Sequence, residues 1–424
     1  DWSPRWADTS SRAGGIWSCS LVVAGRQIRS RARGSGAVWR TGRLTRVSEL
    51  VASSSVSVPA MVPAIVGAGQ SIDRPGDHDL TDAPGPIELM VAASRAAADD
   101  AGAPGLLDRV GWIGVAGGFF GYTNPGAVVA EHLGLSGVAT ALTEITGTAP
   151  QDMVGIACER INAGELDVAL VLGGEARWSA GRLKRAGIDA SWDRSPGEGT
   201  PEHIGGFDPI ALAEMGVLGS TTAFYALFED ALRLRSGRTV DEQRTHCAEL
   251  WARFSAVAQS NPFAWDRSHH DATAIRDASV ANRMICFPYP KAMVANNTVN
   301  MASAIIVCSA EVARSAGVPG DRLVYPQVVT SSHETWEVLR RDELAGNPAL
   351  TTAGHAALEH AGLDVAQIDH VHPRRAIADH IIGLHRFGLG LRAGRPAARA
   401  AVVLFLFGAG HRPLFLDQRL TVGD

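Results

Sequence analysis

Cysteine, the residue best suited to nucleophilic chemistry, occurs five times in this sequence, at widely separated positions. The five are Cys19, Cys158, Cys247, Cys286 and Cys308. No two of them form a CxxC pair, and no histidine stands at zinc-ligand spacing from a cysteine pair, so the sequence does not predict a structural metal site. An odd number of scattered cysteines is more typical of reduced thiols in the cytosol than of a disulfide framework.

A histidine–glutamate pair, His333–Glu334, follows the apolar segment Leu323 to Thr330. If that segment is a strand, the pair lies at its C-terminal end, where α/β sheets collect ligands. We therefore take His333 as a candidate catalytic base whose ring Glu334 orients. The alternative is a solvated loop histidine, and the sequence alone leaves both open.

Strand and helix patterns alternate around these residues beyond the first 60 positions. Apolar runs bounded by glycine, such as Pro63 to Gly69 and Asp167 to Leu172, predict buried strands, whereas Pro86 to Ala101 and Pro150 to Ala163 predict helices. The alternation predicts an α/β fold of βαβα units with a mostly parallel sheet. Between Arg182 and Asp277 long helical segments replace it, which predicts an inserted lobe.

The two ends of the chain differ in composition from the centre. Thr9 to Ser48 holds eight arginines and no acidic residue, and His372 to Asp424 holds eight arginines against three acidic residues. We interpret residues 1–60 as a disordered or non-native basic extension, or else as a targeting segment. The tail is interpreted either as a basic helix with a closing strand, for which Ala400 to Phe407 is the candidate, or as sequence from a disturbed reading frame.

Overall composition limits the class of protein. The chain has 424 residues, 46% of them hydrophobic, and 39 Lys and Arg against 44 Asp and Glu give a net charge of −5. This predicts two or three packed units and does not favour a nucleic-acid partner. The longest apolar runs are about half the length of a membrane-spanning helix. We expect a cytoplasmic protein without a resident cofactor.

Three segments carry a resemblance to a known family. They are INAGELDVALVLGGEA (Ile161 to Ala176), the stretch from Pro288 to Pro319, and ALEHAGLDVAQIDHV (Ala357 to Val371). In this order and spacing they resemble the thiolase superfamily, whose members handle acyl-CoA thioesters. In the second segment the family has an Asn-containing turn that opens a buried helix.

A closer resemblance is to actinobacterial thiolase-like proteins often named acetyl-CoA acetyltransferases. It is carried by Ile145 to Val154, Leu250 to Trp265 and Asn282 to Met293. Those proteins usually continue into an extra C-terminal domain, before which this chain stops.

The resemblance implies a particular organisation of the chain. We expect an α/β, thiolase-like fold of two βαβα-type halves with mixed five-stranded sheets and a helical insertion lobe. The expected parts are residues 61–182 and 276–319 for the N-terminal half, 183–275 for the acyl-CoA-binding lobe, and 320–424 for an incomplete C-terminal half with an atypical tail from 372.

The nucleophile of the family is missing where the resemblance places it. Thiolases keep a cysteine seventeen residues before the glycine of the A-G-E turn, and counting back from Gly164 reaches Gly147. The family's catalytic Glu aligns with Arg374–Arg375. The turn that supplies the family's histidine base is matched only weakly, by Gly410 to Pro413. Cys158 lies three helical turns from Gly147, and Cys308 sits in an apolar run, so neither replaces the nucleophile.

A binding site is nevertheless expected at Gly147. The predicted helix start at Thr148 offers backbone N–H groups, with Thr148 as its cap. Lys291, Asn296 and Asn297 would lie on the turn that faces the active site in the family and hold a phosphate or a thioester oxygen. Alternatively, the two asparagines only form a turn and cap the next helix. Phe224 and Tyr225 belong first to the lobe's own core, although in the family this lobe also contacts CoA.

Three hypotheses about function follow. The first is a thiolase-like acyl-CoA acyltransferase of lipid or fatty-acid metabolism with weak or altered catalysis. The second is a non-catalytic acyl-CoA- or lipid-binding protein, or a partner subunit, and the third is a degraded copy. Expected partners are acyl-CoA or CoA, a second copy of the chain paired through an exposed strand of the first half, or a thiolase-related or lipid-binding subunit.

Overall fold

The computed structural model describes the central part of the chain with side chains and three short strands by backbone alone. The ranges are 60–189, 192, 195–205, 214, 216, 218–335, 337–365 and 368, together with the backbone strands at 18–25, 370–371 and 401–404. Within these ranges, no helix is both long enough and apolar enough to cross a membrane.

The first sheet has six strands, one more than expected, and is mixed as predicted. Its order is β2 (Pro63–Ile72), β9 (Asn300–Ser309), β5 (Val168–Ala176), β3 (Trp112–Val115), β4 (Ala139–Thr143) and β6 (Glu202–Ile204). The neighbours β5, β3, β4 and β6 are parallel, whereas β9 runs antiparallel to both β5 and β2. The C-terminal ends of β3, β4 and β5 therefore meet at one edge, beside the start of β9.

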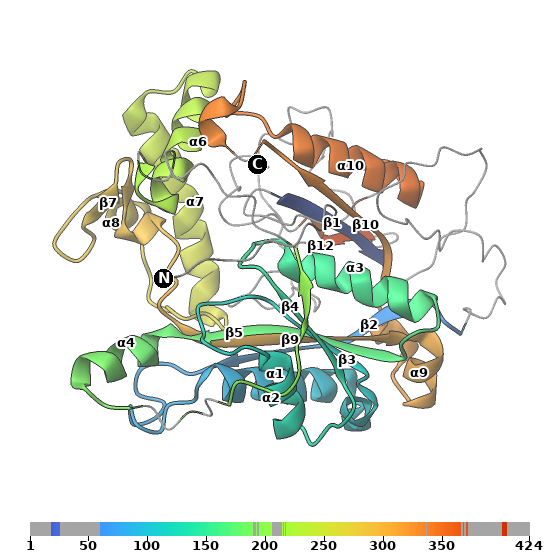
Figure 1. The fold of residues 1–424 in the computed structure, drawn as a ribbon. Helices are drawn as coiled ribbons and strands as arrows, with labels where there is room; N and C mark the ends of the chain where they lie inside the picture. The colour runs from blue at the N-terminus through green and yellow to red at the C-terminus, as the bar shows by residue number, and fades with distance from the viewer. Residues whose placement is uncertain are drawn as a thin grey trace, which may run out of the picture.

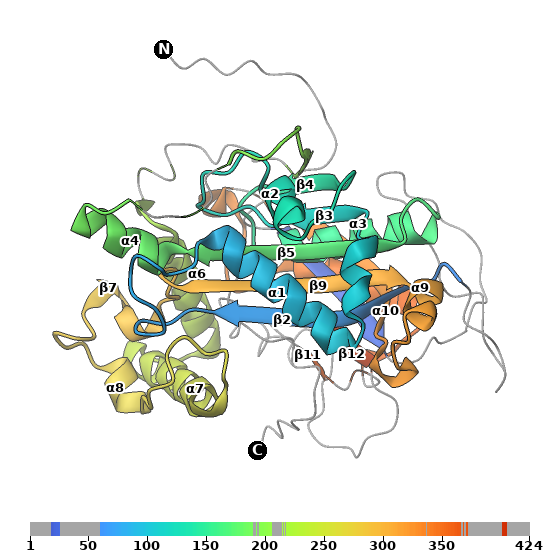
Figure 2. The same cartoon turned by 90° about the horizontal axis from the view of Figure 1, so that it is seen from below.

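Helices cover both faces of this sheet (Figure 2). Helices α1 (Pro86–Ala101) and α2 (Pro125–His132) pack on one face, and α3 (Ala149–Asn162) packs on the other. The close approach of α1 requires glycine in β2, because a Cβ on Gly67 or Gly69 would lie 2.0 or 2.1 Å from backbone oxygens of α1. The alternating small residues of β2 thus fix where α1 lies.

A second sheet lies on the far side of α3 (Figure 1). Its order is β10 (Tyr325–His333), β1 (Ser18–Gly25), β12 (Ala401–Leu404) and β11 (His370–Val371). On one face of this sheet, Gly155 of α3 lies close to Val329 of β10. On the other face lies α10 (Pro348–Ala361), whose Ala353 carbonyl accepts a hydrogen bond of 3.0 Å from Thr330 Oγ1. The layers therefore alternate helix, sheet, helix, sheet, helix.

Several expectations need correction. Residues 1–60 are not wholly without structure, because Ser18–Gly25 form β1, paired antiparallel with β10. The segment after the Asn-containing turn is the strand β9 and not a helix, since its apolar residues lie between β2 and β5. The candidate closing strand does contain β12. The proposals for Arg374–Arg375 and for Gly410 to Pro413 lie outside the described residues.

The described part of the predicted insertion lobe, 183–275, is mostly helical. It holds the end of α4 (Arg177–Ala186) with α6 (Thr221–Ser236), α7 (Val240–Ser260) and α8 (Ala272–Arg276). The hairpin of β7 (Met284–Cys286) and β8 (Tyr289–Pro290) packs on these helices, and we use the term lobe for the helices and the hairpin together. Short elements complete the described chain: η1 (Pro104–Arg109), η2 (Lys291–Met293), α9 (Ala310–Ser315), η3 (Gly320–Arg322) and η4 (Val338–Arg340).

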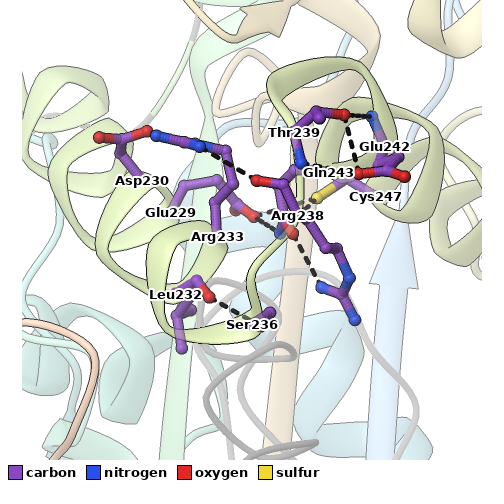
Figure 3. Close-up of polar contacts among 10 residues, drawn as sticks. All are labelled: Glu229, Asp230, Leu232, Arg233, Ser236, Arg238, Thr239, Glu242, Gln243 and Cys247. Carbon is purple, nitrogen blue, oxygen red and sulfur yellow. Dashed lines mark hydrogen bonds and ion pairs between the residues drawn. The ribbon is translucent and has the colours of Figure 1, made fainter.

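Helices α6 and α7 are joined by a polar cluster (Figure 3). The carboxylate of Glu229 on α6 accepts hydrogen bonds from Gln243 and from Cys247 Sγ on α7, the latter at 3.1 Å. Tyr289 OH donates to the other oxygen of Glu229 at 2.9 Å. A capping box between Thr239 and Glu242 fixes the start of α7. These bonds connect α6, α7 and β8 beside two apolar clusters, one around Phe224 and Phe228 and one around Ala248 and Ile275.

Candidate active site

The start of α3 lies at the edge where the parallel strands end. Because α3 connects β4 to β5 and runs antiparallel to β5, its first turn lies beside the C-terminal end of β5. Gly147 immediately precedes Thr148, the residue before the helix, and Gly147 is half-buried. The N–H groups of Gly147 and Ala149 make no hydrogen bond within the described part of the chain. Two such donors at a helix N-terminus can bind an anion or a carbonyl oxygen.

Thr148 does not cap α3 with its side chain, contrary to the prediction. Its hydroxyl lies 3.0 Å from that of Thr146, and its own N–H donates to Thr146 Oγ1 at 3.0 Å. The physical reason is its backbone, which is already helical at φ −103° and ψ −8°, whereas a capping side chain normally needs an extended residue. The first turn also carries the buried Gln151, whose Oε1 has no hydrogen-bond partner among the described residues.

A carboxyl group, Glu175, stands at the end of β5. Its Oε1 accepts a hydrogen bond of 2.5 Å from Phe119 N–H in the loop after β3. The guanidinium of Arg177 lies 4.2 Å from the ring centroid of Phe119. Burial raises the pKa of Glu175, while the Phe119 N–H and the positive charge of Arg177 partly oppose that rise.

Glu175 lies on the face of the sheet that α3 covers. In β5, Ala169 and Val171 pack against α3, whereas a Cβ on Gly174 would meet Met90 of α1. Since side chains alternate along a strand, Glu175 belongs with Ala169 and Val171. Glu175 stands within the motif Ile161 to Ala176 but was not among the predicted site residues. The signal was present as an acidic residue at the end of an apolar strand.

The candidate residues after β8 are exposed. Asn296 Oδ1 accepts a hydrogen bond of 3.0 Å from Thr298 N, which is a side-chain-stabilised turn. The next element is β9, so the alternative that these asparagines cap a helix is wrong. Because Asn300 pairs with Ala176, Asn296 and Asn297 lie near the same edge as the start of α3. Lys291 is exposed in η2, where its N–H bonds to Arg283 O.

His333 ends β10 near the same edge. Val324, just before β10, bridges Ile65 at the opposite edge, so β10 runs toward the end of the molecule where α3 begins. Only the backbone of His333 is described. The carboxylate of Glu334 accepts hydrogen bonds from Thr335 N and, at 3.3 Å, from Ala349 N of α10. Glu334 thus contacts the start of α10, and its expected role in orienting the His333 ring stays a prediction.

The described cysteines do not supply a thiolate at this edge. Burial raises the pKa of Cys158 to about 12, with Glu159 adding to the rise, and burial also raises the pKa of Cys308 to about 12. Cys247 donates its thiol proton to Glu229 in the lobe (Figure 3). Cys286 is half-buried in the β7–β8 hairpin, also in the lobe.

Phe224 and Tyr225 lie in the core of the lobe. Phe224 is buried with Phe228 and Val338, and Tyr225 packs beside them, with its carbonyl accepting a hydrogen bond of 3.2 Å from Tyr289 OH. This arrangement accounts for both residues structurally. Their contact with an acyl-CoA stays a prediction. The described residues contain no group of His, Cys, Asp and Glu arranged to hold a metal ion.

Comparison with known proteins adds to this geometry. No protein-family model and no curated protein matches the sequence. Among solved structures, the chain is similar to a monomeric SCP2-thiolase-like protein type 1 from Mycobacterium smegmatis, with a TM-score of 0.62, 28% sequence identity, and coverage of 79% of this chain and 65% of that one. This chain has a thiolase-superfamily fold.

Two further structures are similar to this thiolase-like chain. The Ltp2-ChsH2(DUF35) aldolase has a TM-score of 0.53, 17% identity, and coverage of 78% of both chains. An acetyl-CoA acetyltransferase from Syntrophomonas wolfei has a TM-score of 0.47, 17% identity, and coverage of 77% of this chain and 82% of that one. Of the mycobacterial protein, this chain spans 65% of the length, which is less than two thirds.

Proposed function

We propose that this chain is a thiolase-like protein of acyl-CoA metabolism that binds a thioester at the start of α3 and acts on it without forming an acyl-cysteine. The observation behind this proposal is that the N–H groups of Gly147 and Ala149, where the family's nucleophile would stand, make no hydrogen bond to any described residue. These donors can polarise a thioester carbonyl in the absence of a thiol. Lys291, Asn296 and Asn297 supply a cation and two amides for the rest of the CoA.

Calorimetric titration tests the binding, and intact-protein mass spectrometry tests the chemistry. We expect acetyl-CoA to bind the wild-type protein and to leave no acetyl adduct. Gly147→Cys should then acquire one acetyl group, because a thiol at a helix N-terminus has a lowered pKa. Gly147→Ala is the matched control, since it adds a side chain without a thiol. An acetyl adduct on a wild-type cysteine, or the absence of any binding, would contradict the proposal.

A second candidate function is that of a non-catalytic subunit. It is favoured by the raised pKa values of Cys158 and Cys308, which leave no described thiolate near the helix start. The name of the similar Ltp2-ChsH2(DUF35) aldolase joins two components, one of them marked DUF35, which supports looking for a partner of that kind. Under this proposal the chain would bind acyl-CoA yet show no turnover alone, and activity would appear only when the partner is added.

A further inference from the structure

We propose that Glu175 is the acid–base group of this site and removes a proton from the carbon next to the thioester carbonyl. This inference rests on the proposed binding of acyl-CoA at the start of α3. It assigns a catalytic role to a residue outside the three elements that the family resemblance supplied, namely Gly147, Arg374–Arg375 and Gly410 to Pro413.

The position of Glu175 relative to α3 leaves room for a substrate. Met153 of α3 lies over Gly114, and Gly114 pairs with Val171 of β5. From Met153 back to Thr148 the helix covers some 7 Å, at about 1.5 Å per residue. From Val171 to Glu175 the strand covers about 13 Å in the same direction. Glu175 therefore extends about 6 Å beyond the helix start, on the side toward which the first N–H groups of the helix point.

The carboxylate of Glu175 is held at one oxygen and open at the other. Phe119 N–H fixes Oε1 at 2.5 Å, and Gly118 lies so close that a Cβ there would be 2.7 Å from the same oxygen. Oε2 makes no hydrogen bond within the described residues. A positioned carboxylate with one free oxygen is the arrangement that a general base requires.

The surroundings of Glu175 suit proton abstraction. Burial raises the pKa of Glu175 from its ordinary value of 4.5, which makes its carboxylate a stronger base. The nearby cation, Arg177, stacks on Phe119 and has a buried Nη1 without a hydrogen-bond partner among the described residues. Its positive charge opposes part of the rise in the pKa of Glu175.

The step is balanced within the site. The C–H bond next to the thioester carbonyl breaks, its proton moves to Oε2 of Glu175, and its electron pair becomes the enolate of the thioester. The enolate oxygen accepts hydrogen bonds from the N–H groups of Gly147 and Ala149. Return of a proton from Glu175 regenerates the thioester, so in heavy water the acetyl group exchanges hydrogen for deuterium.

The test is deuterium incorporation into acetyl-CoA in heavy water, followed by mass spectrometry, with acetyl-CoA binding measured in parallel. We expect exchange by the wild-type protein and a loss of about 100-fold or more in Glu175→Gln. Glutamine keeps an oxygen that accepts the Phe119 N–H, so the loop should be preserved. Glu165→Gln, an exposed position at the opposite end of β5, is the control and should exchange like wild type.

The outcomes separate this inference from the proposed function. Equal exchange by wild type and Glu175→Gln, or binding by wild type without exchange, would overturn the role of Glu175 and leave acyl-CoA binding intact. Failure of the wild-type protein to bind acetyl-CoA would overturn both. A catalytic role also predicts that the exchange rate of the wild-type protein decreases as the pH is lowered through the pKa of Glu175. A purely structural role would not produce this decrease while the protein remains folded.

Discussion

Phe119 and Glu175, 56 residues apart in sequence, are joined by a hydrogen bond of 2.5 Å from the Phe119 N–H to Oε1 of Glu175. The bond fastens the loop after β3 to the end of β5. The same loop is held from the other side, where Gly117 N–H donates to Thr143 Oγ1 of β4 at 2.9 Å. Three neighbouring strand ends are thereby fixed around the start of α3.

The raised pKa of Glu175 predicts a pH-dependent stability. A carboxyl whose pKa is higher in the folded than in the unfolded state stabilises the fold below about pH 4.5, and this contribution is lost as pH rises through the folded pKa. Glu175→Gln, which cannot ionise, should therefore gain stability relative to wild type as pH rises from about 4.5 to 7. Thermal unfolding of both proteins at several pH values measures this. A constant difference across that range would contradict the prediction.

The cysteines should differ sharply in reactivity. Cys158 and Cys308, with pKa values raised to about 12, should resist iodoacetamide in the folded protein at pH 8, whereas the half-buried Cys286 should be labelled first. Peptide mapping by mass spectrometry gives the order of labelling. Denatured protein is the control, because all thiols should then react. Early labelling of Cys158, which is half-buried like Cys286, would contradict the raised pKa of its thiol.

Asn300 should be important for stability. Its fully buried side chain donates to Asp73 Oδ2 at 3.0 Å and to Ser179 Oγ at 2.6 Å, and it accepts from Ser179 N. Asn300→Ala would leave these buried groups short of partners and should cost about 3 kcal/mol in urea unfolding. The exposed Asn297→Ala is the matched control and should stay within about 0.5 kcal/mol of wild type.

Two glycines allow the cost of a clash to be separated from the cost of backbone strain. Gly197 and Gly199 both have positive φ, at 80° and 70°, but a Cβ on Gly197 would lie 2.2 Å from Asn124 O, while one on Gly199 meets nothing within 4 Å. Gly199→Ala should cost about 1 kcal/mol. Gly197→Ala should cost clearly more, by thermal unfolding, and equal costs would contradict the described contact.

The edge of the first sheet predicts a monomer. Pairing of two copies through an exposed strand of the first half was the expected route to a dimer. In the described residues β4 does not offer such an edge, because β6 occupies its outer side, with Ala141 opposite Glu202. A second copy would have to displace β6 to form the same hydrogen bonds. Light scattering coupled to size exclusion should therefore give the mass of one chain. A dimer mass would show that another surface associates.

The sequence alone determined the alternation of elements in the centre of the chain. Apolar runs ending in glycine predicted β2 and β5, and helical periodicity predicted α1 and α3, because burial on one face imposes a local period on the order of apolar and polar residues. The family resemblance also placed Gly147 just before α3, because the family's spacing counted back from Gly164 reaches this position.

Tertiary structure decided the features that depend on contacts between residues distant in the sequence. The apolar segment Asn300–Ser309 suits a helix or a strand by composition, and only its place between β2 and β5 made it β9. Thr148 has the right type to cap α3, but its backbone conformation, set by the preceding turn, directs its hydroxyl to Thr146. Glu175 gained its raised pKa and its partner Phe119 only when the ends of β3 and β5 were brought together. Burial and electrostatics depend on neighbours distant in sequence, so local patterns do not contain them.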